Sequence, residues 1–268
     1  MDALASGARQ YRTATEPSSS RWPTEEKRAE ASLRALELFG ISQPAPLLLA
    51  LIRARRSGPP KLRAKQFNET LQVIERFHFQ HTIVAQLRSS GGVSEMYAKA
   101  ARELFAAGSD TQARANVLSS IRAKLIERRP DREQFLLAFE ERFYFTDQYT
   151  RESKLIRYLL ANFLRHFNPT TRSDDLSIEH ILPQSAIKTS ADFTVIGSIG
   201  NLLLVSPKIN QRLGEKPFKQ KRQILAGDGA AFDIGNVIGE TTWGEREIAN
   251  RTTRLAESAY DEVWKLPL

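Results

Sequence analysis

The stretch between residues 177 and 221 constrains the fold more than any other part of the chain. Two short apolar runs, at 176–182 and 201–205, are rich in Leu, Ile and Val and are separated by a polar loop. Pro207 follows the second run, and proline suits the first turn of a helix, where its missing N–H is not needed. The order strand, loop, strand and helix predicts a small ββα unit.

The chain before this stretch shows helical periodicity without the alternating pattern of half-buried strands. The segment 151–167 is the clearest example, and further helices are predicted at 47–56, 94–107, 111–127 and 131–143. The predicted fold class is therefore mainly α. Residues 1–167 are expected to form an all-helical supporting region, and residues 168–268 an α+β module that ends in a helix at about 244–265.

Composition excludes several kinds of site and favours a polyanionic partner. The chain has no cysteine, which rules out disulfides, thiolate zinc sites and cysteine nucleophiles. The formal net charge is +8, and such an excess favours partners rich in phosphate. Basic residues gather in two segments, 53–65 and 208–222. No apolar run reaches the roughly 18 residues that span a bilayer, and no signal-peptide pattern opens the chain, so a cytoplasmic location is expected.

Four side chains within the central stretch supply the groups that phosphodiester hydrolysis requires, namely Glu179, His180, Asn201 and Asn210. Histidine is the natural base near pH 7, and a carboxylate with an amide suits Mg²⁺. Because adjacent strand residues point to opposite faces, Glu179 and His180 can serve one site only where the strand ends. We expect Asn210 to complete the metal site opposite Glu179, and the amide of Asn201 to bond either the loop or the imidazole.

The motifs EHILPQ and IGNLLLVSPKIN resemble the ββα-metal core of His-Asn-His (HNH) nucleases. The subtype is the one found at the C-terminus of GmrSD-like modification-dependent restriction enzymes and SspE-like phage-defence proteins. The pattern F-x-x-K-R at 218–222 and the pattern W-x-x-x-x-I-x-x-R-x-x-x-L-A at 243–256 are similar to that subtype, and so is the helical lead-in.

This resemblance implies an HNH-type DNA endonuclease, of nickase type, in restriction or phage defence. By it His180 is the general base, Asn201 the supporting asparagine, and Glu179 and Asn210 the ligands of one Mg²⁺ or Mn²⁺ ion. The expected phosphate contacts are Lys208, Arg212, Lys216, Lys219, Lys221 and Arg222. The partner is DNA, which the helical region 1–167 is also expected to contact, with no membrane.

The sequence departs from the family at its start, because it has no D-G-Q-Q-R motif of the nucleotide-hydrolysing domain that the family usually carries. The chain is then either part of a longer protein, with such a domain or partner protein, or a natural short form. Two other functions stay open: a nucleic-acid-binding adaptor with a degenerate HNH site, and an RNase.

Overall fold

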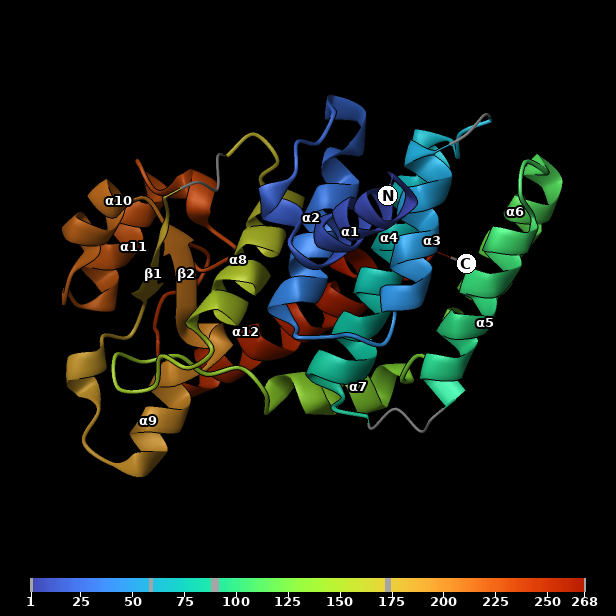
Figure 1. The fold of residues 1–268 in the computed structure, drawn as a ribbon. Coiled ribbons are helices and arrows are strands. Elements are labelled where there is room, and N and C mark those ends of the chain that lie inside the picture. The colour runs from blue at the N-terminus through green and yellow to red at the C-terminus, as the bar shows by residue number, and fades with distance from the viewer. Residues whose placement is uncertain (1, 58–59, 88–91, 172–174, 268) are drawn as a thin grey trace. The chain divides into compact units, whose positions relative to one another are not determined.

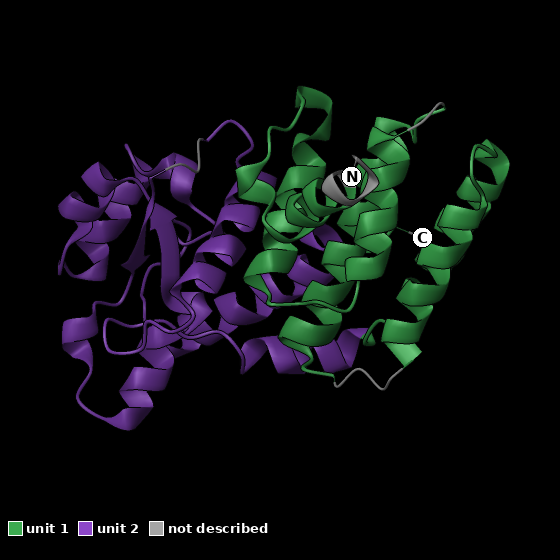
Figure 2. Cartoon of the chain, in the orientation of Figure 1, with its two compact units in different colours: residues 1–131, 266–268 green, residues 132–265 purple. Residues whose placement is uncertain are grey.

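The computed structural model describes residues 2–57, 60–87, 92–171 and 175–267. The fold is mainly helical, with a small two-stranded antiparallel sheet in the C-terminal half, which confirms the predicted fold class (Figure 1). The chain forms two compact units (Figure 2). Unit 1 comprises residues 1–131 and 266–268, and unit 2 comprises residues 132–265.

Unit 1 is a helical assembly around one hydrophobic core. Helices α2 and α4 pack together, as do α3 and α5, and α6 packs against α4 and α5. The core includes Leu33, Leu51, Phe67 and Tyr97, none of which is exposed. The helices are α1 Asp2–Thr15, α2 Lys27–Leu38, α3 Ala45–Arg56, α4 Ala64–His78, a π-helix Phe79–Val84, α5 Gly92–Ala106 and α6 Thr111–Glu127.

Unit 2 surrounds a β-hairpin with helices. Helix α10 lies beside β1 and helix α8 beside β2 (Figure 1). The strands are β1 Ser177–His180 and β2 Leu202–Val205. The helices are α7 Arg132–Glu140, α8 Ser153–Phe167, α9 Ser190–Gly197, α10 Pro207–Leu213, α11 Phe218–Ala226, α12 Glu245–Ser258 and a π-helix Ala259–Val263.

The hairpin register sets which residues end the first strand. Ser177 pairs with Val205, Glu179 with Leu203, and His180 with Leu202. The strand β1 is shorter at each end than the predicted segment 176–182, and it ends at His180. The two strands and the following helix predicted for this stretch are present, but the segment between the strands, predicted as a loop, contains helix α9.

The compact units do not divide where the sequence analysis divided the chain. The units meet in sequence between residues 131 and 132, so α7 and α8 belong with the hairpin rather than with the N-terminal helices. The functional division at residue 167 remains a prediction. No described helix has the length and apolar character needed to cross a membrane.

Candidate active site

His180, at the end of β1, has one ring nitrogen held by a main-chain carbonyl. Its Nε2 lies 2.8 Å from the carbonyl oxygen of Phe145, and the imidazole stacks on the Phe145 ring with a centroid separation of 5.9 Å. A carbonyl oxygen only accepts hydrogen bonds, so Nε2 must carry the proton. In the neutral ring the lone pair is therefore on Nδ1, which is the nitrogen that can accept a proton.

The carbonyl that holds His180 is itself fixed by main-chain hydrogen bonds. The N–H of Phe145 donates to the oxygen of Gly197 at 2.8 Å, and the N–H of Ile199 donates to the oxygen of Phe143 at 3.0 Å. The segment before α8 thus lies against the end of α9. Sequence reasoning did not identify Phe145, and no local signal could have done so, because its role comes from a carbonyl that every residue has.

The surroundings of His180 keep its imidazole neutral. Burial lowers the pKa of His180 below the ordinary 6.5, and the charge of Lys221 acts in the same direction. The Phe145 carbonyl and the charge of Asp147 oppose this shift without overcoming it. At pH 7 the ring is in the form that accepts a proton.

Glu179 forms a buried ion pair with Lys221 of α11. Lys221 Nζ donates to Glu179 Oε1 at 2.6 Å and to the main-chain oxygen of His180 at 2.7 Å. The Glu179 side chain is 9% exposed and the Lys221 side chain is 1% exposed. Burial raises the pKa of Glu179 and lowers the pKa of Lys221, and the attraction between the two groups opposes both shifts. Two oxygens of the β1 end therefore converge on one cation.

Lys221, which the sequence analysis expected to contact phosphate, is buried in this structure, and its role as a phosphate contact stays a prediction. Helix α11 begins at Phe218, directly after Pro217. In this helix Lys221 faces strand β1 and Arg222 faces the loop that contains Ile238. The stem of Lys221 is covered by protein, and its ammonium is bonded to Glu179. The expected contact would require this ammonium to leave the carboxylate.

Asn210, on α10, lies beside the same face of β1 as Glu179. Its amide donates to Ser177 Oγ at 3.0 Å. Side chains two residues apart share one face of a strand, so Ser177 and Glu179 point the same way. The helix starts where it does because Ser206 caps it through the N–H of Ile209 and a proline occupies its first turn.

Asn201 is fully buried and ties the loop after β1 to the rest of unit 2. Its Oδ1 accepts from the N–H of Leu182 at 2.8 Å and from the indole N–H of Trp243 at 3.0 Å. Its Nδ2 donates to the carbonyl oxygens of Leu182 and Ile196. Of the two roles expected for this amide, the structure has the loop contact, and His180 is oriented instead by a main-chain carbonyl. Asn201 is a positioning residue here.

Arg251 is a second positioning residue. It is the arginine of the pattern at 243–256, for which the sequence analysis predicted no role. It is not exposed, and it donates to the main-chain oxygens of Gly200, Leu202 and Ile234 at 2.7, 3.0 and 2.8 Å. Burial lowers its pKa to about 9, so it remains charged at pH 7. These bonds join α12 to the start of β2.

A signal for Arg251 does exist in the sequence. It lies three residues after Ile248 and four before Leu255, so it falls within the apolar stripe of α12. A charged residue in such a stripe must find partners inside the protein, because an unpaired buried charge is very costly. The stripe also explains Gly200, where a Cβ would lie 2.1 Å from Thr252 Oγ1.

The donors near Glu179 fit one hard cation with few protein ligands. Within the described residues, no group of three or more His, Cys, Asp or Glu side chains is placed to hold a metal ion. Mg²⁺ does not need three such side chains, because it keeps several waters and binds one or two carboxylates. The ammonium held by two oxygens at the end of β1 shows that this position favours a cation. Whether Glu179 holds a metal ion there remains a prediction, and a metal ion at Oε1 would have to displace Lys221.

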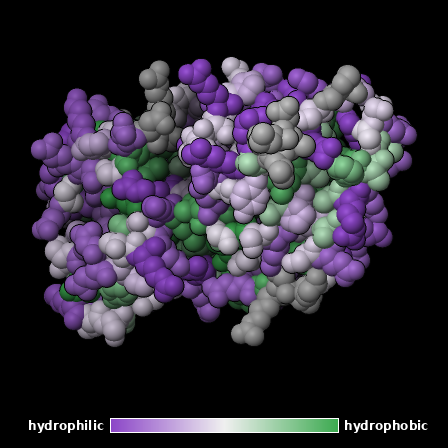
Figure 3. Space-filling view, viewed as in Figure 1, coloured by the Kyte–Doolittle hydropathy of each residue, from purple (hydrophilic) through white to green (hydrophobic). Residues whose placement is uncertain are grey.

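The basic residues predicted to contact phosphate differ in exposure. Lys208, Lys216 and Lys219 are exposed, and Arg212 pairs with Asp228 at the surface. Arg222 is half-buried and donates to the oxygen of Ile238, so its charge serves the fold. The surface over α10 and α11 is mostly hydrophilic on the face shown in Figure 3. Of the predicted phosphate contacts, the three exposed lysines are the ones that are accessible to a DNA backbone.

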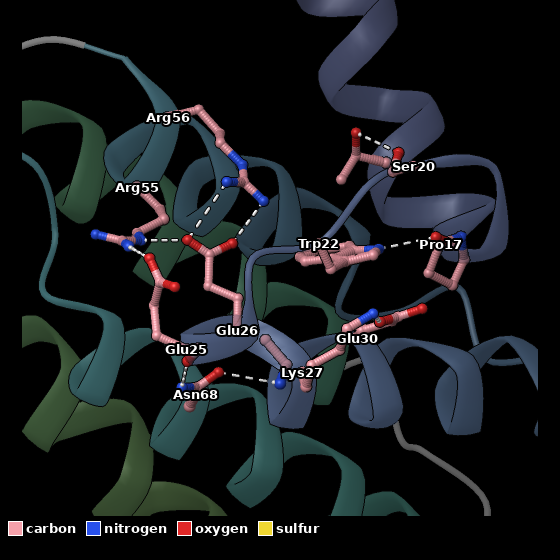
Figure 4. Close-up of polar contacts among 12 residues, drawn as sticks. Pro17, Ser20, Trp22, Glu25, Glu26, Lys27, Glu30, Arg55, Arg56 and Asn68 are labelled. Carbon is pink, nitrogen blue, oxygen red and sulfur yellow. Dashed lines mark hydrogen bonds and ion pairs between the residues drawn. The ribbon is translucent and has the colours of Figure 1, made fainter.

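Two arginines of the basic segment 53–65 in unit 1 form ion pairs within the protein (Figure 4). Arg55 Nε lies 2.7 Å from Glu26 Oε1, and Arg56 pairs with the other oxygen of the same carboxylate. Glu26 is not exposed, so the two guanidiniums neutralise a buried charge. Arg53 is exposed and takes no part in this cluster. Residues 58 and 59 of the segment lie outside the described residues.

Comparison with known protein families assigns the domain that holds this site. Residues 136–258 match the model of the family described as "GmrSD restriction endonucleases, C-terminal domain". The matched region begins within α7 and ends with α12, so it contains the hairpin, Glu179, His180 and the positioning residues. A search of curated proteins found no match. Residues 136–258, which make up most of unit 2, belong to the family of GmrSD restriction endonuclease C-terminal domains.

Proposed function

We propose that unit 2 is a DNA endonuclease that uses one Mg²⁺ or Mn²⁺ ion, cuts one strand at each encounter, and acts against foreign or phage DNA. The family is one of restriction endonucleases, which implies a nuclease that acts on DNA. The observation that carries the finer proposal is the hydrogen bond from His180 Nε2 to the Phe145 carbonyl, because it leaves Nδ1 as a base of fixed orientation.

In this proposal His180 takes a proton from the attacking water at Nδ1. The Phe145 carbonyl keeps the ring from rotating and stabilises the imidazolium that forms, as an acceptor opposite the reacting nitrogen does in other catalytic histidines. The lowered pKa of His180 keeps the ring unprotonated before the reaction. Asn201 acts through the loop that follows the strand and touches no reacting group.

Glu179 and Asn210 would hold the metal ion, with water completing the shell. When bound, such an ion neutralises charge on the phosphate and on the leaving oxygen. Lys221 would give up Glu179 Oε1 in that state, which frees its ammonium for a phosphate oxygen. The exposed Lys208, Lys216 and Lys219 would hold the DNA backbone, so intrinsic sequence specificity is expected to be weak.

The test is conversion of supercoiled plasmid to nicked circle in Mg²⁺, Mn²⁺ or EDTA. Wild type and His166→Ala should nick in a metal-dependent manner, and His180→Ala should not. His166 is the matched control, because it is an exposed histidine of the same unit. It lies at the end of α8 and pairs with Glu262. Equal cutting by His180→Ala and wild type would refute the assigned base.

A non-catalytic adaptor is the alternative with a specific observation behind it, since an ammonium already occupies the Glu179 carboxylate. DNA binding by wild type without cleavage in any metal would support the adaptor. An RNase is separated from a DNase by offering RNA and DNA of the same sequence side by side. Nicking that requires an added nucleoside triphosphate or second protein would point to a nucleotide-hydrolysing partner.

A further inference from the structure

Phe105 is a large apolar side chain on the surface of unit 1, and it carries a cation on its ring. It lies in the last turn of α5 and is 60% exposed. The guanidinium carbon of Arg53, on α3, lies 4.3 Å from the ring centroid. Single exposed apolar residues are common and need no explanation. A surface phenylalanine held by an arginine is a more specific arrangement, because cations over aromatic rings are infrequent in proteins.

Two clefts flank Phe105. The first has a volume of about 390 Å³ and is lined by α1, α3 and α5, with Gln10, Leu49, Arg53 and Arg102 among its residues. The second has a volume of about 280 Å³ and is lined by α3, α5 and the start of α6, with Ser57, Ser109 and Arg114 among its residues. Phe105 and Arg53 line both clefts, so they form the ridge between them.

The charges around this ridge have one sign. Arg53, Arg102 and Arg114 line the clefts, and none of the described residues that line either cleft is acidic. The neighbouring acid on α5, Glu103, faces Lys99 at 3.8 Å. Arg114 is 8% exposed, donates to the Pro60 oxygen at 2.7 Å, and has an Nε without a hydrogen-bond partner among the described residues. The surface therefore complements an anion.

An exposed aromatic ring between arginines fits a strand of nucleic acid with unstacked bases. Bases stack on aromatic side chains and on guanidinium planes, and a basic groove follows the phosphates. A duplex offers its bases only at its ends, so it would gain charge attraction here but little stacking. An acidic peptide would use the arginines without needing the ring.

We propose that the ridge formed by Phe105 and Arg53 binds single-stranded nucleic acid, with one base stacked on Phe105 and the adjoining phosphates beside Arg53 and Arg102. This site is in unit 1 and uses no residue of the proposed nuclease centre. It stands or falls independently of cleavage by unit 2.

The test is fluorescence anisotropy with the full chain, in EDTA so that nothing is cut. A labelled single-stranded oligonucleotide is compared with a blunt duplex of the same sequence. Phe105→Ala should weaken single-strand binding about 5- to 150-fold, the range for loss of one base stacked on an aromatic ring, and should leave duplex affinity unchanged. Phe105→Trp should retain the wild-type affinity. Leu137→Ala is the matched control, because Leu137 is 62% exposed on α7.

The arginine is tested separately through salt dependence. Arg53→Gln should weaken single-strand binding and reduce the slope of log affinity against log salt by about one. Arg28→Gln, which removes an exposed arginine of α2, is the control and should leave the slope unchanged.

Three results would overturn the proposal. One is single-strand binding by Phe105→Ala equal to that of wild type, and the second is equal loss of single-strand and duplex binding in that variant. The third is equal quenching of 2-aminopurine fluorescence when a labelled oligonucleotide binds wild type and when it binds Phe105→Ala. Since the ring is exposed and alanine favours helix, loss of folding does not enter the comparison.

Discussion

The ion pair between Glu179 and Lys221 makes the sharpest prediction about unit 2, through the substitution Lys221→Met. Methionine is one atom shorter than lysine but has nearly its volume and keeps an unbranched apolar stem, so the substitution removes the charge and opens little space. Glu179 Oε1 then loses its partner at 2.6 Å, and the His180 oxygen loses a donor at 2.7 Å. A carboxylate whose side chain is 9% exposed remains without a counter-charge.

The expected loss in the free energy of unfolding is about 3–5 kcal/mol, the range for removing one partner of a buried pair. The loss should depend on pH with a definite sign. Burial already raises the pKa of Glu179, and removing Lys221 raises it further. A raised folded-state pKa gives stability that is present below the unfolded-state pKa and is lost as pH rises through the folded-state value. The difference between variant and wild type should therefore shrink as pH falls.

The assay is urea unfolding followed by tryptophan fluorescence in a Trp22→Phe background. The remaining tryptophans, Trp243 and Trp264, both report on unit 2. Lys219→Met is the matched control, because Lys219 is exposed on the same helix, and it should change stability by less than about 0.5 kcal/mol.

Two further arms separate the pair from general damage. The double variant with Glu179→Gln should be more stable than Lys221→Met alone, because no buried charge is left uncompensated. Millimolar Mg²⁺ should stabilise Lys221→Met more than wild type, since a ligand that binds only the folded state stabilises it and the competing ammonium is gone. Unfolding of Lys221→Met at the same urea concentration as Lys219→Met would refute the reasoning.

Three other predictions concern backbone approach and protonation. Gly200→Ala should cost at least about 1–3 kcal/mol, because its Cβ would lie 2.1 Å from Thr252 Oγ1, while Gly7→Ala, with open space around its Cβ, should leave the melting temperature unchanged. The cleavage rate should decline at low pH with a midpoint below 6.5, because the pKa of His180 lies below that ordinary value; a midpoint above 6.5 would contradict this. Burial lowers the pKa of His78 to about 3, so stability should be lost as pH falls from 6.5 toward 3, by up to about 1.4 kcal/mol per pH unit; His78→Gln should show a shallower slope in acid unfolding curves.

Local pattern predicted both strands and the start of α10, because those signals are short-range, but it did not predict α9, which lies in the segment expected to be a loop. The apolar runs, the proline of α10 and the serine before it determine two strands and a helix start within about thirty residues of sequence. Pro183 predicted that the first strand ends by residue 182, and β1 ends two residues earlier, at His180. The compact-unit boundary between residues 131 and 132 had no such signal, because it depends on which faces of α7 and α8 pack with the hairpin.

Side-chain partners in the site were harder to predict from sequence. The types of Glu179, His180, Asn201 and Asn210 identified the chemistry, and the family match supports the nuclease class. Their roles as metal ligands and base remain predictions. The loop contacts of Asn201 are in the structure, whereas the inward position of Lys221 and the carbonyl of Phe145 came from folding alone.

The sequence by itself determined the two strands, the start of α10 and the types of functional group near the end of β1. Tertiary structure decided the tautomer of His180, the cation beside Glu179 and the buried role of Arg251. The physical reason is range. Helix and strand signals act over a few residues, whereas burial and hydrogen bonding join atoms that lie 35 residues apart for Phe145 and His180 and 42 apart for Glu179 and Lys221, and only the packed chain sets which of these meet.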